Sequence, residues 1–145
     1  MRLVVQRVKR ASVSVVGTNK SVGEIKNGLL VLVGVKEGDS KKDADLLVEK
    51  LAKLRIMSDK VGKMNLSVKD VDASILAVSQ FTLYADTSKG NRPSFIKAAN
   101  PKLAQEVYEY FVAQLKERGI KVETGRFGDY MEISTLLDGP VTIIL

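Results

Sequence analysis

The sequence predicts an α+β fold, a mostly antiparallel β-sheet or barrel with two or three flanking helices. Three observations support this prediction: apolar and polar residues alternate near the N-terminus, two later segments have helical periodicity, and the last quarter returns to short apolar segments. At 145 residues the chain has the usual size of one domain, so we expect residues 1–145 to form a single domain.

The N-terminal segment is predicted to form antiparallel strands. Residues 2–16 alternate, with a polar break at residues 7–11, which indicates one long or bulged strand. Residues 17–20 are predicted to form a turn. Asn27-Gly28 is predicted to close a hairpin before the apolar run 29–35, because both residues tolerate positive φ.

Two helices follow from the spacing of apolar residues. The first is predicted over residues 41–55, with Ser40 as its cap. The second is bracketed by Asn100 as N-cap, Pro101 at the first helical position and Gly119 beyond its end. The predicted buried faces are Ala44, Leu47, Val48, Leu51 and Leu54 in the first helix, and Ala104, Val107, Tyr108, Phe111 and Leu115 in the second.

The remaining apolar segments are predicted to be strands. Residues 74–84 are long and apolar enough for a central strand, in which alternation places Ser79 and Thr82 on opposite faces. Residues 122–124, 130–134 and 141–145 are predicted as shorter strands, and Asp138-Gly139-Pro140 is predicted as the turn before the last of them.

The chain contains no cysteine and no histidine, and this excludes several kinds of catalytic site. Nucleophile pairs that need histidine, zinc sites of the Cys/His kind and redox dithiols cannot form. Catalysis must therefore depend on carboxylates, lysines, hydroxyls, backbone dipoles, an oxygen-ligated metal or the substrate itself. Among these we expect no metal, and we also expect no cofactor. A hydrolase with a metal held by carboxylates alone is the alternative, which a chelator tests.

The net charge of +6 is concentrated near the N-terminus, where residues 1–35 contain six cationic residues and one acid. Such a segment suits a phosphate-rich partner, and a solvated basic surface is the alternative. The loop residues Ser88, Lys89 and Arg92 likewise suit either phosphate or solvent. The sequence has no membrane span and no signal peptide, which predicts cytoplasmic residence.

The segment Ser79-Gln80-Phe81-Thr82 is the first candidate site. It ends an apolar run and leads into a polar loop, so hydroxyls, a side-chain amide and backbone N–H groups meet at one sheet edge. These groups are the components of an oxyanion site, and ordinary strand residues with local hydrogen bonds are the alternative.

Several motifs together resemble the D-aminoacyl-tRNA deacylase family over essentially the whole chain. They are Val5-Gln6-Arg7-Val8, Arg10-Ala11-Ser12-Val13, Ser79-Gln80-Phe81-Thr82-Leu83, Asp86-Thr87, Gly90-Asn91-Arg92-Pro93-Ser94-Phe95, Gly125-Arg126-Phe127-Gly128 and Asp138-Gly139-Pro140-Val141-Thr142. Leu137 stands where the family motif has asparagine, so the hydrogen bonds of that asparagine must be absent or replaced here.

The resemblance implies a homodimer that hydrolyses the ester between tRNA and a D-amino acid, or glycine mischarged on tRNA-Ala, and spares L-aminoacyl-tRNA. In the family a cis Gly-Pro peptide reaches into the partner's pocket, which implies that the carbonyls of Gly139 and Pro140 fix the substrate amino group. Arg7 would hold that loop, and Phe127 and Met131 would contact substrate.

The expected mechanism uses the ribose hydroxyl of the terminal adenosine to assist water, and the N–H groups of Phe81 and Thr82 to stabilise the oxyanion. Ser79 and Gln80 complete the expected catalytic segment. A nucleophilic or water-positioning Thr82 is one alternative, and a non-catalytic RNA-binding module is another.

Overall fold

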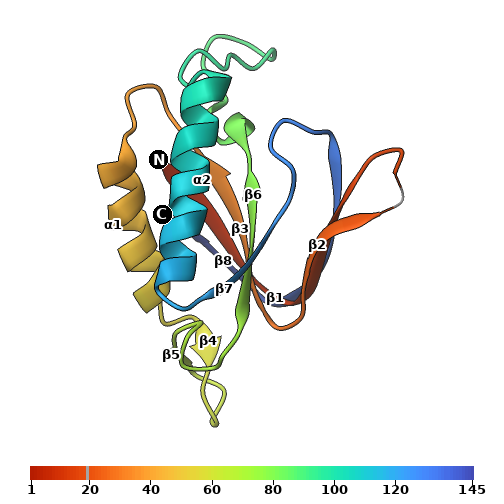
Figure 1. The fold of residues 1–145 in the computed structure, drawn as a ribbon, viewed down its shortest axis with the longest axis vertical. Helices are drawn as coiled ribbons and strands as arrows, with labels where there is room; N and C mark the ends of the chain where they lie inside the picture. The colour runs from red at the N-terminus through yellow and green to blue at the C-terminus, as the bar shows by residue number, and fades with distance from the viewer. Residues whose placement is uncertain (19) are drawn as a thin grey trace.

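We describe the fold from a computed structural model, which covers residues 1–18 and 20–145 (Figure 1). The predicted turn at residues 17–20 includes Asn19, which lies outside the described residues. The elements are β1 (Arg2–Val15), β2 (Ser21–Ile25), β3 (Gly28–Gly34), α1 (Lys41–Lys53), β4 (Met57–Ser58), β5 (Met64–Leu66), β6 (Ser74–Ser79), the 3₁₀ helix η1 (Phe81–Tyr84), α2 (Pro101–Glu117), β7 (Lys121–Thr124) and β8 (Met131–Ile144).

Strand β1 organises the sheet, because it pairs with β2, β3 and β8, all antiparallel. Val8 pairs with Gly28 and Ala11 with Ile25, so two residues lie between these pairs on each side. β2 and β3 therefore continue one another along one edge of β1. The predicted hairpin at Asn27-Gly28 is wrong, since the chain does not reverse there.

Strands β3, β6 and β7 add two parallel pairings to the antiparallel ones, which makes the sheet mixed. The middle of β2 approaches the end of β7 closely, and a Cβ atom on Gly23 would lie 2.5 Å from the Thr124 carbonyl oxygen. The sheet thus curves until it is nearly closed. The predicted α+β class, with a mostly antiparallel sheet or barrel and two flanking helices, is confirmed.

The reason for glycine at position 28 is close packing, not positive φ. A Cβ atom there would lie 1.9 Å from the backbone carbonyl oxygen of Ser74, the residue that pairs with Gly28 at the start of β6. Neither Asn27 nor Gly28 is among the positive-φ residues of the described chain. The residue type was informative, but the hairpin explanation for it was incorrect.

Gly28→Ala should destabilise the protein by about 3 kcal/mol, because the β3–β6 pairing must separate to admit the methyl group. For a chain of this length this lowers Tm by about 10 °C, which differential scanning calorimetry can measure. Gly38→Ala is the control: Gly38 has φ 85° and open space around it, so only a conformational cost of about 1 kcal/mol is expected. Equal losses for the two variants would contradict the packing explanation.

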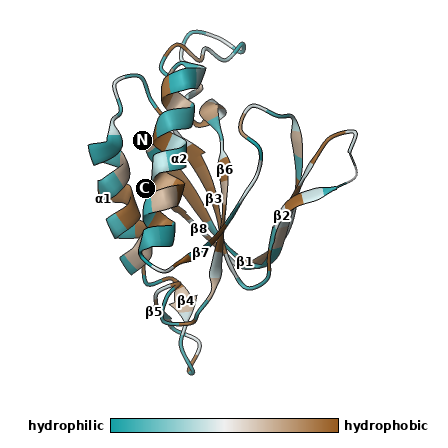
Figure 2. Cartoon of the chain, viewed as in Figure 1, coloured by the Kyte–Doolittle hydropathy of each residue, from teal (hydrophilic) through white to brown (hydrophobic). Residues whose placement is uncertain are grey.

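Both helices lie on one face of the sheet, as Figure 1 shows, and their sequence-predicted ends are nearly right. The Ser40 backbone N–H and hydroxyl both donate to the Asp43 carboxylate, and Asn100 Oδ1 accepts from the Leu103 N–H at 3.0 Å. The predicted faces are confirmed: all five residues in α2 are buried, while Leu47 and Leu54 of α1 are partly buried. Figure 2 shows hydrophilic residues on the outer helix surfaces and apolar ones on the strands behind.

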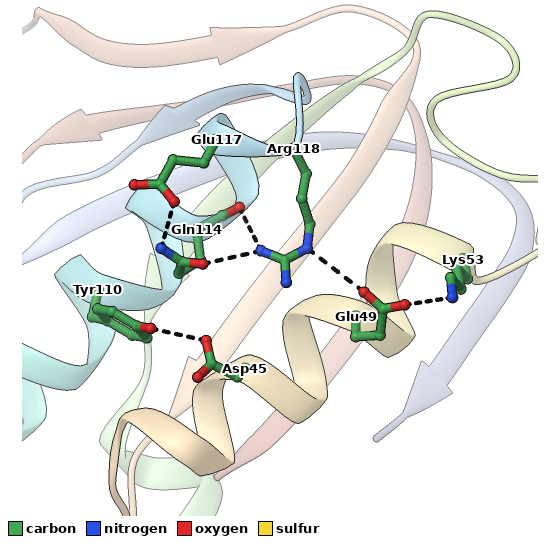
Figure 3. A network of polar contacts seen from close by, with 7 residues as sticks. All are labelled: Asp45, Glu49, Lys53, Tyr110, Gln114, Glu117 and Arg118. Atoms are coloured by element: carbon green, nitrogen blue, oxygen red, sulfur yellow. Dashed lines mark hydrogen bonds and ion pairs between the residues drawn. The ribbon is translucent and has the colours of Figure 1, made fainter.

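Polar side chains connect α1 and α2 on their solvent side (Figure 3). The Tyr110 hydroxyl donates to Asp45 Oδ1 at 3.0 Å, and this hydrogen bond raises the pKa of Tyr110. Arg118 pairs with Glu49 at 3.7 Å, and Glu49 also pairs with Lys53. These contacts link the solvent-facing sides of α1 and α2. No helix in the described ranges is long and apolar enough to cross a membrane.

Strand β8 is one strand interrupted by a bulge, and not the two predicted strands joined by a turn. Gln6 pairs with Thr142 and Val8 with Leu137, so the single residue Arg7 lies opposite the four residues 138–141. The chain continues in the same direction on both sides of the bulge because β1 is long enough to pair with both halves.

Candidate active site

The predicted central strand over residues 74–84 ends early, because β6 stops at Ser79 and η1 begins at Phe81. Gln80 still donates its backbone N–H to the Val33 carbonyl at 2.8 Å, and the chain then turns. The predicted alternation of Ser79 and Thr82 on opposite faces is therefore wrong, since these residues belong to different elements.

The turn leaves two backbone donors free at the end of β6. Leu83 donates to the Gln80 carbonyl at 3.3 Å and Ala85 donates to the Thr82 carbonyl at 3.0 Å. Within residues 1–18 and 20–145, no acceptor is found for the N–H groups of Phe81 and Thr82. Unpaired donors at a protein surface can bind a carbonyl oxygen or an oxyanion.

The Thr82 hydroxyl contacts an amide. Gln80 Nε2 lies 2.5 Å from Thr82 Oγ1, and both side chains are at least partly exposed. An amide is not a base in either of its orientations, so this contact cannot remove the hydroxyl proton. The arrangement suits a fixed, weakly nucleophilic Thr82 beside two free N–H groups.

A cavity of about 650 Å³ opens beside this segment. It is lined by six residues that the sequence motifs mark as candidates, which are Ser79, Gln80, Phe81, Thr82, Phe127 and Met131. The structure adds Ala98, Asp129 and Tyr130, which no sequence motif marks, and Phe95, which belongs to a family motif but was not predicted as a site residue. Their positions depend on long loops, which explains why no local pattern identifies them. The volume is that of a small-molecule or nucleoside site.

Helix α2 supports the part of the cavity wall that contains Phe127. The buried Tyr108 hydroxyl donates to the Ala77 carbonyl at 2.9 Å, and burial raises the pKa of Tyr108 far above its usual value. The Tyr108 ring lies 6.1 Å from that of Phe127. Met131 Sδ accepts the Arg126 backbone N–H at 3.3 Å. Phe127 and Met131 are thus fixed apolar surfaces of the cavity.

Aromatic side chains form the other wall. The Phe81 and Phe95 rings meet edge to face with centroids 5.1 Å apart, and 54% of Phe81 is exposed. Such exposed rings offer a surface on which a planar base or an apolar side chain can stack. The cavity therefore combines apolar walls with a short polar edge at residues 79–82.

Arg7, Gly139 and Pro140 form a separate cluster, and none of the three is among the residues that line the cavity in the described chain. Arg7 is 8% exposed, and its Nε lies 2.9 Å from Asp138 Oδ2 and 3.3 Å from the Asp138 carbonyl. Its Nη1 donates to the Ile56 carbonyl at 2.8 Å and to Ser58 Oγ at 3.2 Å. Arg7 therefore anchors the bulge to β4.

The bulge presents Gly139 and Pro140 to solvent. The Gly139-Pro140 peptide bond is cis, and Gly139 has φ 130°, a value that favours glycine. Leu137, at the position of the family asparagine, is 41% exposed and pairs with Val8. The Arg7 contacts to Asp138 hold the bulge without a polar side chain at position 137.

Known proteins are similar to this chain over its whole length. A family model described as D-Tyr-tRNA(Tyr) deacylase matches residues 4–145. The D-aminoacyl-tRNA deacylase of Koribacter versatilis (strain Ellin345) is 56% identical over 145 residues, which cover 100% of this chain and 96% of the relative. The protein of that name from Thermosipho africanus (strain TCF52B) is 53% identical, with the same coverage.

Solved structures agree with this fold. The structure of a c-Myc DNA Unwinding Element Binding Protein matches with a TM-score of 0.92 and 41% identity, over 100% of this chain and 97% of that one. A probable eukaryotic D-amino acid tRNA deacylase matches with a TM-score of 0.86 at 16% identity, over 99% of this chain and 97% of that one, which shows the fold alone. Because the family model and the relatives span the cavity, the η1 segment and the bulge together, this chain belongs to the D-aminoacyl-tRNA deacylase family.

Proposed function

We propose that this protein hydrolyses the ester bond between a D-amino acid and the terminal adenosine of tRNA, releasing the amino acid and free tRNA in the cytoplasm. The observation that carries the proposal is the pair of unbonded N–H groups at Phe81 and Thr82, in the described part of the chain, on the edge of a cavity of nucleoside size. The family to which the chain belongs supports the same reaction.

The chemistry needs no histidine. An aminoacyl ester is already activated, and the neighbouring ribose hydroxyl can assist the attack of water on the carbonyl carbon. The tetrahedral intermediate places negative charge on the former carbonyl oxygen, and the two N–H groups stabilise that charge. The protein then contributes mainly orientation and oxyanion stabilisation.

The direct test of the activity is release of D-tyrosine from D-tyrosyl-tRNA by purified protein in the presence of EDTA. We expect hydrolysis that the chelator does not reduce. Absence of hydrolysis would contradict the proposal, and activity that EDTA abolishes and a divalent metal restores would favour the carboxylate-metal alternative instead.

A homodimer is part of the proposal. β8 pairs only with β1 among the described strands, so its other edge is unpaired, and Ile133, Leu136 and Leu137 are exposed along it. The exposed bulge lies outside its own cavity, and in a dimer the carbonyls of Gly139 and Pro140 would fix the substrate amino group in the partner's cavity. Chiral selection follows, because the L side chain would point at this bulge. Analytical ultracentrifugation should give twice the chain mass, and a monomer active at the same concentration would contradict this part.

Glycyl-tRNA mischarged on tRNA-Ala is the proposed second substrate. Glycine has no side chain to meet the bulge, so steric exclusion of L-amino acids does not extend to it. Hydrolysis of glycyl-tRNA-Ala should therefore proceed while L-alanyl-tRNA-Ala persists. Equal persistence of both substrates would contradict this extension.

Thr82→Ala should retain activity within about 10-fold of the parent, since the variant keeps the backbone donor at position 82. Removal of a true nucleophile would lower the rate constant of single-turnover hydrolysis by a far larger factor. Activity lost by more than about 1000-fold in a folded Thr82→Ala protein would support the nucleophile role instead.

Nucleic-acid binding without catalysis is a second candidate. It is favoured by the net charge of +6 and by the similarity, at 41% identity, to a protein described as DNA unwinding element binding. Retention of tRNA or duplex DNA with a salt-dependent affinity, together with no ester hydrolysis, would select this candidate over the deacylase.

A further inference from the structure

The loop at residues 85–98, between η1 and α2, is held in a defined shape. Asp86 and Ser94 exchange two backbone hydrogen bonds of 2.8 and 2.9 Å. The Asp86 carboxylate also accepts the Ser88 N–H at 3.0 Å and pairs with Lys97 Nζ at 2.8 Å. These contacts close the base of the loop, and residues 87–92 form its exposed tip.

Two cations at the tip are free of internal partners. Hydrogen bonds from Lys97 and Ser88 hold the pKa of Asp86 well below its usual range, so this carboxylate stays charged and neutralises Lys97. Lys89 and Arg92 are exposed, and in the described part of the chain their side chains have no hydrogen bond and no ion pair. The tip therefore carries two uncompensated positive charges.

The loop also forms part of the cavity wall. Phe95 and Ala98 line the cavity, and the Phe95 ring rests against Phe81, the first residue of η1. Phe95 therefore connects the cavity wall to the loop whose tip carries Lys89 and Arg92.

The two rims of the cavity differ in charge. The rim at residues 85–98 contains three cations and one carboxylate, whereas the second rim at residues 125–132 contains one cation and two carboxylates. Asp129 itself lines the cavity. A polyanionic chain is therefore attracted to the first rim and repelled by the second.

We propose that Lys89 and Arg92 bind the backbone phosphates of the single-stranded acceptor end that precede the terminal adenosine of the substrate tRNA. The proposal rests on the function proposed above. Lysine and arginine side chains supply positive charge and hydrogen bonds to the phosphates of a flexible single-stranded RNA without reading its base sequence. This suits an enzyme that must accept many tRNAs.

The test compares the double variant Lys89→Gln/Arg92→Gln with the parent on D-tyrosyl-tRNA. At about 0.1 M salt we expect KM to rise about 10-fold, and the slope of log KM against log salt to fall by about 1.5, the value for two lost phosphate contacts. Lys60→Gln/Lys63→Gln is the matched control. It removes two exposed charges beside β4 and β5, at the opposite end of the molecule in Figure 1, and should leave KM and slope unchanged.

A second substrate separates this inference from the proposed function. 3′-D-tyrosyl-adenosine has no phosphate. With this substrate the KM of the Lys89→Gln/Arg92→Gln variant should therefore be about equal to the KM of the parent. If the parent hydrolyses D-tyrosyl-tRNA and the loop variant keeps the parent KM and slope, the inference is wrong and the function stands. If the parent hydrolyses neither substrate, the function itself fails. A competition assay gives a further test, in which a single-stranded CCA end should inhibit hydrolysis of D-tyrosyl-tRNA more strongly than blunt duplex DNA. Equal inhibition by the two competitors would also overturn the assignment.

Discussion

Phe81→Pro should lower kcat for D-aminoacyl-tRNA by about 100- to 1000-fold relative to Phe81→Ala, because proline removes one oxyanion donor. Both variants lose the ring, and only proline loses the backbone N–H, so their ratio isolates that group. Single-turnover hydrolysis measures the effect without interference from product release.

The structure can accept this proline. The Phe81 N–H has no acceptor among the described residues, so no internal hydrogen bond is lost. Phe81 is the first residue of η1, a position at which proline is tolerated. A proline disfavours helical backbone angles at the residue before it, and Gln80 has φ −145° and ψ 87°, which are not helical. Circular dichroism should show both variants folded. A folded Phe81→Pro protein as active as Phe81→Ala would contradict the oxyanion role.

Arg7→Ala should lower the activity by about 100-fold, because a misplacement of about 1 Å in a positioning group can cost that much. The guanidinium makes four contacts, two to Asp138 and one each to Ile56 and Ser58, and it holds the bulge that carries Gly139. The variant should also lose about 2 kcal/mol of stability, less than for a fully buried pair because 31% of the Asp138 side chain is exposed.

Arg55→Ala provides the control for Arg7→Ala. Arg55 donates to the Asn65 carbonyl at 2.7 Å at an exposed site, so its loss should cost less than about 1 kcal/mol and leave the activity intact. Assays at 25 °C on variants that circular dichroism shows to be folded at that temperature separate misplacement of the bulge from unfolding. Full activity of a folded Arg7→Ala protein would show that Arg7 does not position the bulge.

The helices were predictable because their signals are local. Asn100, Pro101 and the 3.6-residue spacing of apolar residues define α2 without reference to the rest of the chain. The residues of the η1 segment were also identifiable, since a polar Ser-Gln-Phe-Thr after an apolar run is unusual. Their geometry was not, because the change from strand to 3₁₀ turn at Gln80 depends on packing against β3.

The arrangement of the strands could not be predicted from local patterns. Gly28 is required by a carbonyl of Ser74, which is distant in sequence. The bulge opposite Arg7 exists because β1 pairs with both halves of β8, and a turn signal at Gly139-Pro140 cannot distinguish a bulge from a reversal. Asp129 and Tyr130 reach the cavity for similar reasons, through contacts between distant segments.

The proposed chiral selection is tested most directly by the ratio of hydrolysis rates for D-tyrosyl-tRNA and L-tyrosyl-tRNA, measured with the same purified protein. The two substrates differ only at the chiral carbon, so the ratio reports on how the site distinguishes the side chain from the hydrogen atom. A clash that costs about 3 kcal/mol or more gives a preference for the D form above about 100-fold. Equal hydrolysis of the two substrates would contradict the proposed selection.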